Sequence, residues 1–262
     1  MKKKKGGVNL KRRLKFYKTL DGTGFSCFGG EAEWSLPHRN DDGTWHPGEW
    51  MPEIEGELKE CENGYHVASF RQLIYWLAPR IFEVGVGREI VKCNDKYIVR
   101  KIRLTKELVN WNEGEARLFA CDCAERVLPI YEAKHPNDIR PRNAIEVARL
   151  FVNTPTKFNA LRLARDAACK AWGQDVACKA WGQDVASRYV ALSAMYASST
   201  YTYAAFDAAY AARAAISAVR EAAKAEALAR GLNESEALSV ALKTMDAMEE
   251  WQVMRLGKIL CS

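Results

Sequence analysis

The sequence predicts an α+β protein in which a small mixed sheet region precedes an all-α, alanine-rich helical bundle. Short alternating segments rich in β-branched and aromatic residues, separated by glycine-containing turns, occupy residues 16–110. From Glu113 onward alanine, the strongest helix former, replaces them. Helix-capping signals recur through this second half. We therefore divide the chain into a basic flexible arm (1–15), an α+β domain (16–110) and an all-α helical domain (111–262).

The positive charge is concentrated at the N-terminus. The chain has 262 residues, a net charge of +6 and 48% hydrophobic residues, so it can bury a substantial core. Eight lysines and arginines lie in residues 1–15, and the remainder is close to neutral. Such an arm can hold nucleic-acid phosphates without sequence preference. A solvated leader explains the same charge block, and both interpretations remain open.

Location and redox state follow from the absence of certain segments. No apolar run is long enough to cross a bilayer, so no membrane association is expected. The basic start is not followed by the apolar segment of a signal peptide. Eight cysteines are scattered along a chain that needs no disulfides to fold. We expect a cytoplasmic protein with free thiols.

The first strands alternate and end at turn signals. Residues 14–20 alternate and meet the Asp21–Gly22 turn. Residues 24–28 and 33–36 are shorter extended candidates, and an irregular loop spans residues 37–52. Trp34, Trp45 and Trp50 lie in or beside this loop. Their rings either pack onto the sheet or line a cleft, since aromatic residues dominate small cores.

A short helix and two strands complete the first region. Ser69 can cap a helix over residues 70–77, which Pro79 ends. Residues 80–86 form a strand. The clearest strand is 97–104, whose alternation breaks only at Arg100.

Residues 121–152 hold two helical patterns that meet at a polar hinge, residues 135–142. Pro136 stops the first helix, and Pro141 suits the first turn of the second, where a missing N–H costs little. Asp138 can accept hydrogen bonds from freed N–H groups or pair with Arg142. We expect a tight corner between two helices. Asp138, Arg140 and Arg142 either stabilise it or bind the carboxylate or phosphate of a partner.

The alanine-rich stretch predicts a compact bundle. Thr154–Pro155 opens a helix, residues 198–200 are a candidate break, and Gly231 ends the alanine-rich part. Asn233 caps a last helix that runs from Glu234 to about Leu256.

A nonapeptide is duplicated within this stretch, as residues 169–177 and 178–186. A nine-residue shift rotates a helix by about two and a half turns, so Trp172 and Trp181 should face opposite sides. We expect one tryptophan to be markedly more exposed than the other. The duplication either lengthens a helix or presents a second tryptophan to a partner.

Few residues form a pattern typical of catalysis. Cys121 and Cys123 would stand about 200° apart on a helix, the histidines do not cluster, and no metal site or cofactor is expected. Phosphate-loop and nucleophile-elbow motifs are absent, and we assign no catalytic residue. His66 follows Tyr65 and a turn. It could orient a ligand or act as acid or base, or be a half-buried strand histidine with a satisfied hydrogen bond.

Residues 123–132 and 136–145, the alanine-rich stretch, and Glu250–Trp251–Gln252 together resemble the immunity-protein helical domain of bacterial polymorphic toxin systems. The resemblance covers roughly residues 113–260. It implies a protein that binds and neutralises a toxin without chemistry. Trp251 and Gln252 then join the corner residues as binding candidates.

The first half resembles an uncharacterised domain of bacteriophage proteins. The residues that carry this resemblance are Cys61, Gly64, Tyr65 and His66, with the strand end at residues 102–104. It implies no known activity, and Tyr65 and His66 remain ligand-binding candidates.

Three functional hypotheses follow. The first is a non-enzymatic phage or bacterial accessory protein that binds a protein partner, a toxin or a defence component, in an immunity-like or anti-defence role. The alternative is an enzyme with a nucleotide-derived ligand, similar to an ADP-ribosyltransferase, in the first domain near Tyr65 and His66. The third is nucleic-acid binding through residues 1–15.

Overall fold

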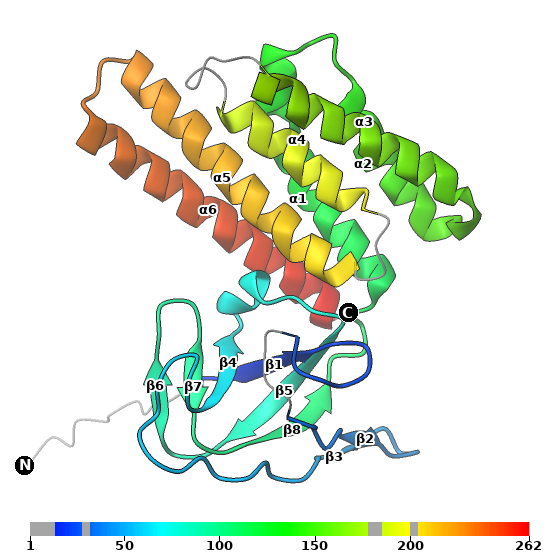
Figure 1. Cartoon of the computed structure of the whole chain (residues 1–262), viewed down its shortest axis with the longest axis vertical. Coiled ribbons are helices and arrows are strands. Elements are labelled where there is room, and N and C mark those ends of the chain that lie inside the picture. The colour runs from blue at the N-terminus through cyan, green and yellow to red at the C-terminus, as the bar shows by residue number, and fades with distance from the viewer. Residues whose placement is uncertain (1–13, 28–31, 178–184, 200–203, 262) are drawn as a thin grey trace, which may run out of the picture.

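The computed structural model describes residues 14–27, 32–177, 185–199 and 204–261, without the side chains of Thr156 and residues 172–177. An antiparallel sheet region is followed by a helical bundle, which confirms the α+β class (Figure 1). The strands are β1 (Phe16–Leu20), β2 (His38–Arg39), β3 (Trp45–His46), β4 (Tyr65–Ser69), β5 (Arg80–Val86), β6 (Ile90–Lys92), β7 (Tyr97–Val99) and β8 (Ile102–Glu107). The helices are α1 (Glu113–Lys134), α2 (Arg140–Asn153), α3 (Phe158–Ala177), α4 (Val185–Ala197), α5 (Ala204–Ala229) and α6 (Glu234–Cys261), with 3-10 turns η1 (Gln72–Tyr75) and η2 (Pro155–Lys157).

Some predictions lie outside the described residues. These are the structure of arm residues 1–13, the break at Thr200, and the relative exposure of Trp172 and Trp181. Of the arm, Lys15 is described, and its ammonium forms an ion pair with Glu83 at 3.0 Å. The cysteines of the described residues are all free thiols.

The six-stranded sheet curls on itself. Its order is β6-β7-β4-β1-β5-β8, with every pair antiparallel. In a flat sheet β7 and β8 would stand about 19 Å apart, four spacings of roughly 4.8 Å, yet only two residues connect them, a reach of about 10 Å. The sheet must therefore curve, and its inner face closes on a core that includes Phe16, Trp34 and Phe82.

The same geometry corrects one prediction. Residues 97–104 are not one strand, because the chain turns at Arg100 and Lys101 from pairing with β4 and β6 to pairing with β5. Arg100 holds the bend. Its guanidinium forms two hydrogen bonds with Glu89, at 2.6 and 2.9 Å, and donates to the carbonyl oxygen of Ile54. The break in alternation at Arg100 was the sequence signal for this turn.

The predicted helix over residues 70–77 is also wrong. The chain forms only the single 3-10 turn η1, and Ser69 does not cap it but donates to the Gln72 side chain from its N–H and its hydroxyl, both at 2.9 Å. Leu73, Ile74 and Leu77 are fully buried. Packing against the helices therefore outweighs local helix propensity here.

The tryptophans near the first loop separate into different environments. Trp34 is buried in the sheet core, whereas Trp50 is exposed and lies beside the cationic groups of Lys101 and Arg103. The irregular loop predicted over residues 37–52 contains the short hairpin of β2 and β3.

The predicted capping signals hold at the junction of α5 and α6 but not at Thr154, whose hydroxyl donates to the carbonyl oxygen of Leu150 at 2.7 Å and does not cap the turn η2. Asn112 caps α1 by accepting from the N–H of Glu115 at 3.1 Å. Gly231 follows α5 with a φ of +86°, and Asn233 and Glu236 form a reciprocal capping box at α6, with both bonds 3.0 Å. The helix α6 continues to Cys261, beyond the predicted end near Leu256.

One core joins the sheet to the bundle. Tyr17 and Ile81 on the outer face of the sheet, with Leu73 and Leu77 at η1, share a single buried cluster with the helices. Trp111 lies between the two regions and donates from its indole N–H to the carbonyl oxygen of Ala78 at 2.9 Å. The division at residues 110 and 111 stays a prediction, since apolar packing is continuous across it. No helix in the described ranges is both long and apolar enough to traverse a bilayer.

Candidate functional site

The α1–α2 corner is held by two doubly hydrogen-bonded ion pairs. The guanidinium of Arg140 donates to both carboxylate oxygens of Asp138, at 2.8 and 2.5 Å. Arg142 pairs in the same way with Glu132 near the end of α1, at 2.7 and 2.8 Å. Of the two alternatives for Asp138, the pair with Arg142 does not form, whereas acceptance from a backbone N–H does, at Arg140. The corner itself forms at the predicted place. Each arginine is engaged inside the chain, so a structural role explains the charged cluster.

Asp138 is the central acceptor of the corner. Besides Arg140 it accepts from the hydroxyl of Tyr131 at 2.5 Å and from the N–H of Arg140 at 3.1 Å. The Arg140 guanidinium, supported by Tyr131, holds the pKa of Asp138 well below its usual range. Because the folded-state pKa is depressed, the ionised carboxylate stabilises the fold above the unfolded-state pKa of about 3.9, and this stabilisation is lost as pH falls below that value.

Replacing Asp138 with asparagine should lower the free energy of unfolding by about 1–3 kcal/mol at neutral pH. The loss follows because Arg140 and the buried Tyr131 keep only weakened partners. Urea unfolding at several pH values checks this: the difference from wild type should narrow below about pH 4. Glu146→Gln is the matched control, an exposed carboxylate on α2, and it should have little effect. A difference that stays constant down to pH 2 would refute this assignment.

Of the two binding candidates on α6, Gln252 is fully buried and Trp251 is partly buried. Gln252 is 0% exposed and donates from its amide to the carbonyl oxygen of Ala212 at 3.0 Å, which ties α6 to α5. Trp251 is half-buried against the core, with the guanidinium of Arg126 4.5 Å from its ring centroid. Gln252 therefore stabilises helix packing and does not reach a partner in this structure.

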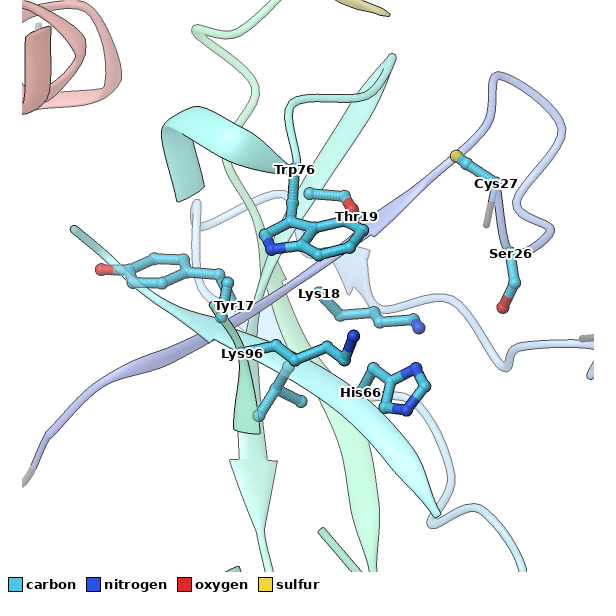
Figure 2. Close-up of a pocket in the computed structure, with 10 residues that line it drawn as sticks. Tyr17, Lys18, Thr19, Ser26, Cys27, His66, Trp76 and Lys96 are labelled. Carbon is cyan, nitrogen blue, oxygen red and sulfur yellow. The ribbon is translucent and has the colours of Figure 1, made fainter. Parts of the chain in front are cut away.

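Tyr65 and His66 alternate on β4 and point to opposite faces. Tyr65 packs on Trp34 at the inner face of the sheet and donates from its hydroxyl to the carbonyl oxygen of Pro52 at 2.9 Å. His66 faces a small cavity of about 50 Å³ (Figure 2). We expected Tyr65 and His66 to be ligand-binding candidates at one place. Because successive side chains of a strand point to opposite faces, the two residues do not share a site.

The motif from Cys61 to His66 has a structural explanation. Cys61 has a φ of +62° and donates from its N–H to Nε2 of His66 at 3.3 Å, while the Asn63 amide donates to two carbonyl oxygens. Gly64 has a φ of +139°, and an added Cβ would lie 2.2 Å from Cγ2 of Ile98. Glycine is required here by both conformation and close approach.

A larger apolar hollow lies at the end of the bundle away from the sheet, and we call it the distal groove. It has a volume of about 520 Å³ and is lined by residues of α1, α4 and α5: Ile130, Lys134, Val185, Ala186, Glu221, Ala222, Lys224, Ala225, Glu226, Leu228 and Ala229. Figure 1 shows that the α1–α2 corner and the C-terminal end of α5 lie at this same end of the bundle. Ile139 at the corner is 68% exposed.

A second hollow of about 290 Å³ adjoins the distal groove. It lies between α1, α5 and α6, and shares Ile130, Ala222 and Glu226 with the distal groove. Alanines supply much of the lining of both hollows, and their small side chains leave space between the helices. Sequence reasoning missed this site because it depends on the meeting of separate helices, and no local motif marks it.

Four charged residues line the distal groove, and all but Lys134 form an ion pair with a neighbour among the described residues. Lys224 pairs with Glu234 at 2.8 Å, Glu221 with Arg220 at 2.6 Å, and Glu226 with Arg230. An apolar floor with a polar rim is the usual anatomy of a protein–protein interface. Exposed apolar surface of this kind typically marks a binding site.

Comparison with known proteins gives one match. Residues 112–230 match the family model described as "Imm-5 like putative immunity protein". The matched residues run from the cap of α1 to the end of α5, and include every residue of the distal groove. The match is consistent with an immunity-like role and ends before Trp251 and Gln252. No curated protein and no solved structure matches the chain.

Proposed function

We propose that this protein is an immunity-like protein that binds a protein toxin or defence component through the distal groove and neutralises it without chemistry. One observation carries the proposal: the residues that match the immunity family form the part of the bundle that presents the distal groove. Binding alone can block a toxin by covering its working surface. The proposal therefore needs no catalytic group.

The distal groove fits an apolar side chain or helix of a partner. Its floor is Ile130 with the alanines of α5, and Val185 and Leu228 are partly exposed at its edges. A partner that buries this floor gains apolar contact area, while the charged rim favours one orientation. Binding energy in such interfaces concentrates in a few well-packed apolar contacts at the centre.

The enzymatic alternative has less support from the geometry. The cavity beside His66 holds about 50 Å³, whereas sites for drug-sized ligands usually hold about 300–1,000 Å³. It does not enclose a dinucleotide. The comparisons give no support for nucleic-acid binding.

A two-step experiment tests the proposal. The tagged full-length protein is used to capture partners from a bacterial lysate, and each captured protein is expressed alone in a host that lacks this chain. A true target should arrest growth, and co-expression of this chain should restore growth. If no captured protein is toxic, or if toxicity persists despite co-expression, the proposal is wrong.

A further inference from the structure

The cavity beside His66 forms where two neighbouring strands separate. β1 pairs with β4 only at Phe16 and Tyr17, but continues to pair with β5 as far as Leu20. Beyond Tyr17, β1 and β4 no longer pair, and Lys18 and His66 line the gap between them. Figure 2 shows the side chains of Lys18, Lys96 and His66 directed toward the same space, with the Trp76 ring above them.

The charged side chains that line the cavity, Lys18 and Lys96, are both cationic. The Lys96 ammonium is neutralised by Glu60 at 2.9 Å and Asp95 at 3.7 Å. The Lys18 ammonium has no ion pair or hydrogen bond within the part of the chain that the structure describes, and lies 5.1 Å from the centroid of the Trp34 ring. A lysine in the middle of an otherwise buried strand, with no carboxylate partner among the described residues, is a costly arrangement.

The neighbouring thiol does not compensate the charge of Lys18. Burial lowers the pKa of Lys18 to about 8, and raises that of the Cys27 thiol to about 12, so the thiol stays neutral and does not compensate the lysine. Burial also lowers the pKa of His66, and the nearby charges of Lys18 and Lys96 lower it further. An anion in this space would interact favourably with the ammonium of Lys18, which has no ion pair among the described residues, and would favour the charged form of His66.

We propose that this cavity binds the phosphate group of a small molecule, with Lys18 as its principal ligand. Lys96 and the hydroxyls of Thr19 and Ser26, which line the same cavity, add further donors. A phosphate dianion offers more acceptor oxygens and more charge than a carboxylate, and so interacts more strongly with the Lys18 ammonium and the neighbouring donors. The volume of about 50 Å³ admits one such group and leaves the rest of the molecule outside. This site is separate from the distal groove and does not depend on the proposed function.

Calorimetric titration of the full-length protein tests this site. Inorganic phosphate, glycerol 3-phosphate and acetate are titrated into wild type and into Lys18→Met, which keeps the side-chain length and removes the charge. Wild type should bind phosphate and glycerol 3-phosphate more tightly than acetate. Lys18→Met should bind both phosphates about tenfold more weakly or worse. Tighter binding of glycerol 3-phosphate would identify a phosphorylated small molecule, and equal binding would identify free phosphate.

Two comparisons keep the result decisive. Lys15→Met removes an exposed lysine from the approach to the same strand and should leave phosphate binding unchanged. Lys18→Met should melt at the same temperature as wild type or higher when phosphate is absent, because it removes an unpaired charge, so lost binding cannot be attributed to misfolding. No phosphate binding by wild type, or equal binding by wild type and Lys18→Met, would overturn the assignment.

Discussion

A single methyl group at Gly64 is expected to destabilise the protein by roughly 2–6 kcal/mol. In Gly64→Ala the new Cβ would lie 2.2 Å from Cγ2 of Ile98, which is buried, and 3.2 Å from Cδ2 of Leu58. The residue also has a φ of +139°, a backbone conformation that residues other than glycine rarely adopt. Because globular proteins are stable by only about 5–15 kcal/mol, denaturant unfolding should detect this loss easily.

Two further variants separate the causes. Gly22→Ala adds the same methyl group where no heavy atom lies within 4 Å, and should change stability little. In an Ile98→Ala background the 2.2 Å clash is removed, so Gly64→Ala should cost less, and the remainder reports the backbone strain together with the 3.2 Å contact to Leu58. Equal losses in Gly64→Ala and Gly22→Ala would contradict the close approach to Ile98.

Placing an arginine in the distal groove is expected to weaken partner binding by about a hundredfold or more. Ala222 on α5 lines both the distal groove and the hollow beside it. A long cationic side chain at this position would occupy the apolar space that a partner needs and would place a charge there. Arginine is nearly as favourable as alanine in a helix, and the residue is only half-buried, so the bundle should remain folded. Calorimetry with the captured toxin measures the change.

The control for this variant is Leu163→Arg. Leu163 is 64% exposed on α3 and does not line either hollow. Its replacement should leave the affinity for the partner within about threefold of wild type, since isolated exposed apolar residues contribute little. Lost binding in Leu163→Arg, with retained binding in Ala222→Arg, would place the interface on another face of the bundle.

The elements that depend on local chemistry could be predicted from the sequence. The helix ends at Asn233 and Gly231, the strand at residues 80–86 and the α1–α2 corner are all marked by residues with local backbone preferences. The α+β class follows from the same signals. The partners of individual ion pairs were harder to predict. Asp138 is close in sequence to both Arg140 and Arg142, and only the observed geometry shows that it pairs with Arg140.

The elements that depend on distant contacts could not be predicted. The strand break at Arg100 follows from the curl of the sheet. In the sequence, this break is visible only as one residue that departs from the alternation of apolar and polar side chains. Residues 70–77 have helical spacing, yet packing on α5 and α6 limits them to one turn. The distal groove requires α1, α4 and α5 to meet. His66 was a ligand-binding candidate from the sequence and lines the smaller cavity, but Lys18 joins it there only through the pairing of separate strands.

Hydrogen–deuterium exchange on the complex with the captured toxin tests the central claim most directly. We predict that binding slows exchange in the C-terminal turns of α1 and α5, which line the distal groove, and at the start of α4. The sheet strands and the middle of α3 should exchange as in the free protein. Protection confined to the sheet or to α3, with none at the ends of α1 and α5, would contradict the proposed neutralisation through this groove.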